Sequence, residues 1–126
     1  MQPDRESTPF NIETTAKTVS QALQAGYRHI DTAQAYGTER GVGQAIAASG
    51  IPREQLYITS KLANANHGPD DVRRSFDETL ANLCLEQLDL FLVHWPLPTL
   101  YGGDYVSTWK AGRRESSTPA IAPRLI

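Results

Sequence analysis

Residues 27–38 read YRHIDTAQAYGT, and this stretch sets polar side chains at the end of a short strand. His29 and Asp31 alternate with Ile30, which predicts an extended segment with one polar and one apolar face. Tyr36 follows in the loop beyond the strand. The structure predicted for the neighbouring segments should account for the ionisable side chains at this point of the chain.

The apolar pattern outward from this stretch predicts alternating helices and strands. Helical spacing of apolar residues, bounded by Asn, Gly and Pro, predicts helices over 11–25, 38–49 and 68–83. Strands are predicted over 27–32, 56–61 and 88–93. The last of these, LDLFLV, is nearly unbroken in its apolar character, which is typical of a strand buried on both faces of a parallel sheet. The order of elements predicts an α/β fold with right-handed crossovers between parallel strands.

Composition narrows the classes of function. The chain has 126 residues, 40% of them hydrophobic, and a net charge of -2 without a basic run, which argues against binding to nucleic acid or an anionic membrane. No stretch approaches the roughly 20 apolar residues of a membrane span. A single cysteine, Cys84, cannot form an internal disulfide. We therefore expect a reducing, cytoplasmic setting in which Cys84 is a small buried hydrophobic residue.

Each predicted strand ends at an ionisable residue: Asp31, Lys61 and His94. The carboxyl ends of parallel strands open on one face, and that face carries the chemistry in α/β folds. Tyr36 lies in a loop on the same rim. Taken singly, each residue has a structural explanation, such as a turn cap, a solvated charge or a buried imidazole. Their common placement at one rim favours a site.

The combination of Asp, Tyr, Lys and His suits proton donation to a carbonyl oxygen. A phenol titrates near 10, too high for a donor at neutral pH. A lysine ammonium about 4 Å away favours the phenolate by up to roughly 4 kcal/mol at an effective dielectric of 20. An aspartate would keep that lysine charged, and a histidine would orient the substrate oxygen. These groups supply no hydride, so the chemistry requires a nicotinamide cofactor.

Three stretches resemble the aldo-keto reductase family: GYRHIDTAQAYGTERGVG at 26–43, YITSKL at 57–62 and LDLFLVHWPLP at 88–98. The resemblance runs from about residue 10 to about residue 110. It implies the strand-helix units of a (β/α)₈ TIM barrel. It also implies NADPH-dependent reduction of aldehydes or ketones to alcohols, with a small-molecule carbonyl compound as substrate and no metal.

By this resemblance, Asp31, Tyr36, Lys61 and His94 fall on the family's catalytic tetrad. Tyr36 would be the general acid, Lys61 and Asp31 its tuning pair, and His94 the residue that orients the carbonyl. Asp31 would also contact the cofactor near its ribose. His94 and Trp95 would bind the substrate.

The loop KLANANHG, which begins at Lys61, would line the mouth of the site. It carries Ala63 at a position where some members of the family have tryptophan.

A complete barrel needs at least about 200 residues, and this sequence supplies about three strands and three helices of it. We therefore expect a truncated barrel over 11–110, with a frayed segment at 1–10. The tail at 111–126 is expected to be disordered or out of register, as a truncated or frame-shifted reading frame would produce.

Two alternatives follow from the same residues. One is a catalytically inactive remnant that lacks the cofactor-binding half and would act as an interaction partner of a full-length relative. The other is a carboxylate-based hydrolase, which needs two acids on the rim, whereas only Asp31 is firmly placed there. In each case we expect the isolated chain to self-associate through its open sheet edges.

Overall fold

The structure is a computed structural model that describes residues 11–66, 68–94, 106–116 and 124–125. The expected frayed segment at 1–10 lies outside the described residues. The α-helices are α1 Ile12–Gln24, α2 Glu39–Ser49, α3 Pro69–Leu83 and α4 Val106–Ser116. The strands are β1 His29–Asp31, β2 Tyr57–Leu62, β3 Leu90–Val93 and β4 Arg124–Leu125. Short 3-10 turns cover Gln34–Tyr36, Arg53–Gln55 and Asn64–Asn66.

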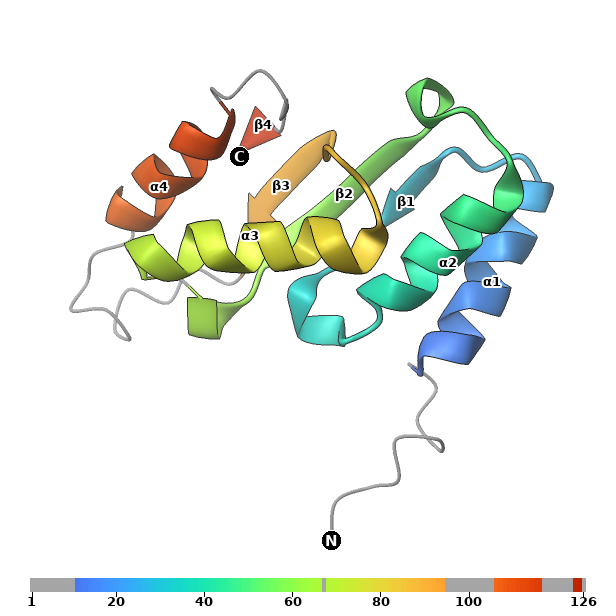
Figure 1. Cartoon of the computed structure of the whole chain (residues 1–126), viewed down its shortest axis with the longest axis horizontal. Helices are drawn as coiled ribbons and strands as arrows, with labels where there is room; N and C mark the ends of the chain where they lie inside the picture. The colour runs from blue at the N-terminus through green and yellow to red at the C-terminus, as the bar shows by residue number, and fades with distance from the viewer. Residues whose placement is uncertain (1–10, 67, 95–105, 117–123, 126) are drawn as a thin grey trace, which may run out of the picture.

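The sheet is parallel and has the strand order β1-β2-β3-β4. Figure 1 shows β1, β2 and β3 side by side. Along the chain, α2 connects β1 to β2 and α3 connects β2 to β3. The predicted α/β fold of parallel strand-helix units is therefore confirmed. In register, Asp31 pairs with Thr59, and Lys61 pairs with Leu92. The ends of the first three strands consequently lie along one rim.

Local sequence signals set the helix ends. Asn11 caps α1 with its side chain, whose Oδ1 accepts from the Thr14 backbone N at 2.7 Å. Pro69 opens α3, where the missing N–H is not needed, and Asp70 and Asp71 follow in the first turn. Gly50 ends α2 in the left-handed conformation with φ of 66°.

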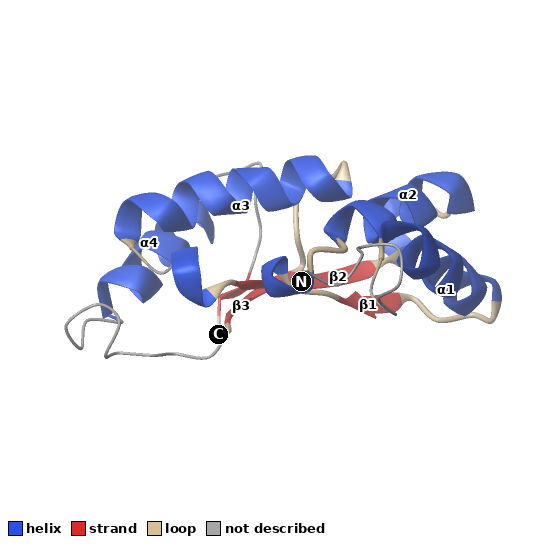
Figure 2. Cartoon of the chain, turned by 90° about the horizontal axis from the view of Figure 1, so that it is seen from below, coloured by secondary structure: helices blue, strands red, loops and turns tan. Residues whose placement is uncertain are grey.

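The helices lie on one face of the sheet, as Figure 2 shows from below, and the hydrophobic core fills the space between the two layers. Ile30 of β1 and Ile58 of β2 point into this core and are buried. Gly43 lets α2 approach α3 closely, because a Cβ there would lie 2.7 Å from the Leu83 carbonyl oxygen. The buried residues of this core cluster are Leu23, Ile30, Val42, Ile46, Leu56, Ile58, Leu62, Val72, Phe76, Leu83, Leu88 and Phe91.

The opposite face of the sheet carries polar and aromatic side chains. On β1, His29 and Asp31 are exposed on either side of buried Ile30, as the period of two requires. On β2, Tyr57 is 40% exposed. In a TIM barrel this face lines the interior, where side chains from other strands pack against it.

The carboxyl-terminal region extends the expected partial barrel. The sequence favoured about three strands and three helices, and the structure adds α4 and β4. Helix α4 continues through Ser116, beyond the expected boundary at 111, because Thr108 and Ala111 pack against the rest of the fold. Strand β4 pairs with β3 through Leu90 and Phe91. The remainder of the expected tail, 117–123 and 126, lies outside the described residues.

Cys84 is exposed, not buried as expected. It follows α3 as the C-cap with φ of 54°, so its side chain turns away from the helix stripe. Leu83, directly before it, occupies the core position and is fully buried. Helix α3 ends at Leu83, at the predicted bound, and Cys84 lies just outside its buried stripe. Within the described part of the chain, none of the helices combines the length and apolar character of a membrane span.

Candidate active site

The rim at the carboxyl ends of the strands brings Asp31 and Lys61 into direct contact. Asp31 ends β1, and Lys61 lies near the end of the neighbouring β2. The Lys61 Nζ donates to Asp31 Oδ1 at 2.7 Å and to the Thr32 carbonyl oxygen at 3.1 Å. The Lys61 side chain is 14% exposed and the Asp31 side chain 57%. The ammonium is thus largely enclosed, while its carboxylate partner is open to solvent.

Tyr36 and His94 lie on the same rim as this ion pair. Tyr36 ends the 3-10 turn Gln34–Tyr36, which Gly37 closes in the left-handed conformation. The Lys61 Nζ is 5.2 Å from the centroid of the Tyr36 ring. The His94 ring, just beyond β3, has its centroid 6.1 Å from that of Tyr36, with the two planes at 87°. The side chains that were predicted at strand ends therefore converge around one tyrosine.

Part of the rim is open to solvent. Tyr36 is 48% exposed, so its ring is accessible even though one side faces Lys61 and His94. Lys61, Tyr36 and His94 bring an amine, a phenol and an imidazole close together at this part of the rim. Trp95, predicted to bind substrate, lies outside the described residues.

Sequence reasoning missed the polar contacts that support this rim. Ser60, next to Lys61 on β2, is fully buried and donates through Oγ to Glu39 Oε1 at 2.5 Å. Glu39 opens α2 and is 4% exposed. The available signal was a serine at a core-facing position of a strand, because a buried hydroxyl needs a partner.

A second polar pair lies beside the rim on the open face of the sheet. The His29 ring nitrogen Nε2 is 3.0 Å from Thr59 Oγ1, and the His29 ring packs edge-on against Tyr57 with centroids 4.8 Å apart. His29 precedes Asp31 by one period of the strand, so a polar row leads along this face toward the ion pair.

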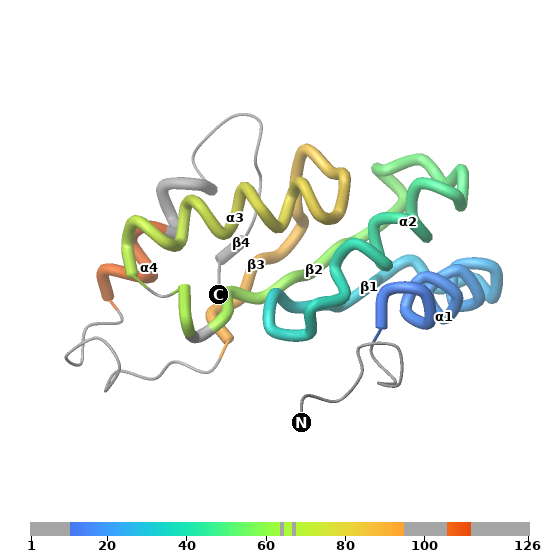
Figure 3. The backbone as a smooth tube through the Cα atoms, turned by 60° about the horizontal axis from the view of Figure 1, so that its bottom comes forward, coloured from blue at the N-terminus to red at the C-terminus, as the bar shows by residue number. Residues whose placement is uncertain are grey.

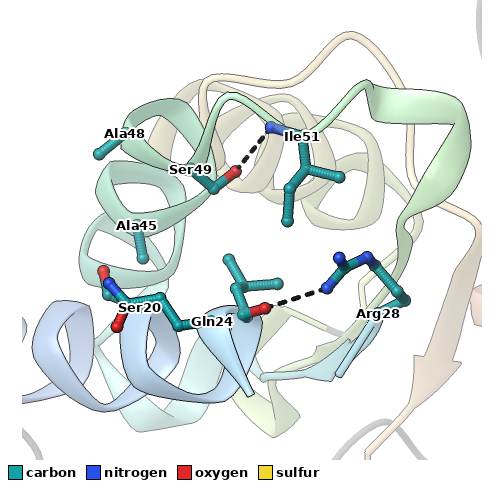
Figure 4. A pocket seen from close by; sticks show the side chains of 8 residues that line it. Ser20, Gln24, Arg28, Ala45, Ala48, Ser49 and Ile51 are labelled. Carbon is teal, nitrogen blue, oxygen red and sulfur yellow. Dashed lines mark hydrogen bonds between the residues drawn. The ribbon is translucent and has the colours of Figure 1, made fainter. Parts of the chain in front are cut away.

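A separate hollow of about 350 Å³ lies between α1 and α2 at the other end of the strands. Figure 4 shows Arg28 and Ile51 at its edge, with Gln24 and Ala45 from the two helices. The Arg28 guanidinium donates to the carbonyl oxygens of Leu23 at 3.0 Å and Tyr27 at 2.8 Å. Since Arg28 directly precedes β1, this hollow is remote from the rim.

The backbone trace in Figure 3 shows the strands side by side, with α1 and α2 at one end of the helix layer, α4 at the other end and α3 between them. The rim is therefore assembled from three consecutive strand-helix units.

Among the described residues, no cluster of three His, Cys, Asp or Glu side chains could hold a metal ion.

Comparison with known proteins gives consistent matches. The model of the aldo/keto reductase family matches residues 1–113. An aldo-keto reductase of Mycolicibacterium smegmatis is 48% identical over 99 residues, which cover 79% of this chain and 35% of that protein. The chain spans about a third of the length of the curated relatives it matches.

Solved structures match in fold as well as in sequence. The aldo/keto reductase of Brucella melitensis superposes with a TM-score of 0.84 at 38% identity, over 92% of this chain and 45% of that one. The aldo-keto reductase of Bombyx mori, solved in complex with NADP, gives a TM-score of 0.80 at 36% identity over 95% of this chain and 42% of that one.

Proposed function

The chain belongs to the aldo/keto reductase family, and from that premise we propose that it carries the proton-donating site of an NADPH-dependent reductase of aldehydes or ketones. The observation that supports the proposal most directly is the position of the Lys61 ammonium. It is 2.7 Å from the Asp31 carboxylate and 5.2 Å from the Tyr36 ring centroid. The ammonium lies over the Tyr36 ring, and a positive charge near a phenol stabilises the phenolate that proton donation would leave.

In the proposed reaction, Tyr36 is the general acid. As hydride reaches the carbonyl carbon, the carbon–oxygen double bond opens and negative charge develops on the oxygen. The Tyr36 hydroxyl then gives its proton to that oxygen, and the Lys61 ammonium stabilises the phenolate that remains. Asp31 holds the ammonium in place through their 2.7 Å ion pair.

His94 has the role of orienting the substrate in this proposal. Its ring lies against the edge of Tyr36 with a centroid separation of 6.1 Å, so a carbonyl oxygen near the phenol would also be near the imidazole. A ring N–H that donates to this oxygen would polarise the carbonyl and fix its direction. We assign Trp95 to the same substrate wall from the family pattern alone.

The described residues fit one end of a nicotinamide cofactor. The Asp31 carboxylate is 57% exposed and engages Lys61 through Oδ1, which leaves acceptor capacity for a ribose hydroxyl. When bound, the reduced nicotinamide supplies the hydride. The relative of Bombyx mori was solved with NADP, which supports the choice of NADPH.

The second candidate is a chain that does not catalyse and acts only by association. The exposed sheet face favours it, because Tyr57 is 40% exposed there and His29 lies next to it. A titration of the chain into NADPH, followed by cofactor fluorescence, separates the two candidates. The reductase requires saturable binding, and the non-catalytic chain requires none.

The test of the reductase is the oxidation of NADPH with a generic aldehyde, measured for the wild-type chain and for Tyr36→Phe. General acids contribute about 10²–10⁴-fold in rate, so the variant should lose most of the activity. Tyr27→Phe is the matched control, because Tyr27 is 66% exposed and lies at the other end of β1. Equal rates in wild type and Tyr36→Phe would assign Tyr36 no role in catalysis.

A further inference from the structure

The side-chain amide of Gln34 joins three segments that are distant in the sequence. Its Oε1 accepts from the Ala63 backbone N at 2.7 Å and from Asn66 Nδ2 at 3.2 Å. Its Nε2 donates to the Ser75 carbonyl oxygen at 3.1 Å and to Thr79 Oγ1 at 3.0 Å. One side chain therefore connects the turn after β1, the loop after β2 and helix α3.

The chemistry of these partners requires an amide at this position. The Ala63 N–H can only donate and the Ser75 carbonyl can only accept, so the orientation of the Gln34 amide is fixed. Glutamate could still accept from Ala63, but its carboxylate cannot donate to α3. Ser75 and Thr79 are both buried, so water is poorly placed to replace the lost donor.

The segments that Gln34 joins carry the proton donor and the cation of the proposed site. Gln34 opens the 3-10 turn that ends at Tyr36, and its carbonyl oxygen accepts from Gly37 N at 3.2 Å. Ala63 lies just beyond Lys61, in the loop that follows β2. The Gln34 side chain thus fixes both segments against the same helix.

We propose that Gln34 is a positioning residue, which sets the Tyr36 ring against Lys61 and His94 and shapes the loop at the mouth of the site. The catalytic meaning of this role rests on the function proposed above. The geometric part of the proposal does not, since it concerns only where the Tyr36 ring lies. The position of the Tyr36 ring and the catalytic activity are therefore measured separately.

The test compares Gln34→Glu and Gln34→Met in the isotope-labelled full chain by NMR. Gln34→Met removes both donor and acceptor, so exchange of the Ala63 amide proton should become about tenfold faster. The Ile58 amide, which donates to Asp89 Oδ2 at 2.8 Å, serves as an internal reference. In Gln34→Glu the Ala63 amide should stay protected.

The His94 ring resonances report on the position of Tyr36, because the two rings are packed edge to face. Both Gln34 variants should shift these resonances, since both release the turn from α3. The matched control is Gln44→Glu, the same chemical change on an exposed part of α2. Unchanged His94 resonances in the Gln34 variants, or equal shifts in Gln44→Glu, would overturn the proposal.

Two further measurements keep the test decisive. If either Gln34 variant fails to fold, Thr79→Val removes one acceptor and keeps the other three bonds, and it should produce a smaller His94 shift in the same direction.

In the activity assay, Gln34→Glu should lower kcat about 10–100-fold, since a displacement of about 1 Å can cost 10²-fold. A chain that reduces no aldehyde but shows the His94 shift would refute the reductase and retain the positioning role. Full activity in a folded Gln34→Glu would overturn the catalytic part of the proposal, and unchanged His94 resonances would overturn the geometric part.

Discussion

Replacing Ser60 by alanine should lower the free energy of unfolding by about 2–3 kcal/mol. The Ser60 hydroxyl is fully buried and donates to Glu39 Oε1 at 2.5 Å, and Glu39 is only 4% exposed. A hydrogen bond to a charged group contributes about 1.5–3 kcal/mol, and loss of the donor leaves a carboxylate oxygen where water has little access. The upper part of that range is therefore expected.

The assay is urea unfolding followed by circular dichroism, within a double-mutant cycle. In a Glu39→Gln background the same serine replacement should cost about 1 kcal/mol, because the bond is then neutral. The coupling energy between the two positions should accordingly be about 1–2 kcal/mol. Ser75→Ala is the control, since this buried hydroxyl donates to the neutral Val72 carbonyl at 3.2 Å and should cost about 1 kcal/mol or less.

The result that refutes this reasoning is a cost for Ser60→Ala that does not exceed the cost for Ser75→Ala. A coupling energy near zero would lead to the same conclusion. In either case Glu39 would be satisfied by other groups, and the contact between α2 and the strand that carries Lys61 would not depend on this hydrogen bond.

Three other predictions concern the packing, the site and the surface. Gly43→Ala should lower the melting temperature by an amount equivalent to about 1–3 kcal/mol of unfolding free energy. The overlap of the new methyl group with the Leu83 carbonyl outweighs a gain of about 1 kcal/mol in helix propensity. A higher melting temperature would contradict the close approach of α2 and α3. Lys61→Met should lower the rate of carbonyl reduction at least about 100-fold while changing the free energy of unfolding by about 1 kcal/mol. Lys17→Met, at an exposed position, is the control. Equal losses of rate in both variants would show that Lys61 has no special role. Light scattering should give a mass above 13.9 kDa that rises with protein concentration. The reason is that β1 is an edge strand of the described sheet and that one face of this sheet is exposed. A constant mass of 13.9 kDa would exclude association through that edge.

The strand-helix order was predictable because each element has a strong local signal. The apolar run at 88–93 indicated a strand inside a parallel sheet, and β3 forms there with Phe91 buried. Parallel strands of similar spacing place their ends together, which explains why Asp31 and Lys61 were expected on one rim. The register adds that Asp31 pairs with Thr59, two residues before Lys61 on the same face of β2, and the two side chains meet at 2.7 Å.

The supporting contacts were not predictable, because they join segments that are distant in sequence. The bonds from Gln34 to α3 depend on how that helix crosses the sheet, which apolar periodicity does not specify. The contact between Glu39 and Ser60 depends in the same way on the position of α2. Cys84 was misplaced because an apolar run does not show that the residue after Leu83 adopts the left-handed conformation and turns its side chain outward. Helix α4 was underestimated because its stabilising partners lie on α3.

The central claim is that Tyr36 delivers a proton to a carbonyl oxygen as hydride arrives at the carbon. The most direct test supplies NADPH with deuterium at the transferable C4 position, together with an aldehyde, and measures deuterated alcohol by mass spectrometry for the wild-type chain and for Tyr36→Phe. The account predicts labelled alcohol from the wild-type chain and formation about 10²–10⁴ times slower in the variant. Labelled alcohol at equal rates from both proteins, or none above the buffer blank from the wild type, would contradict it.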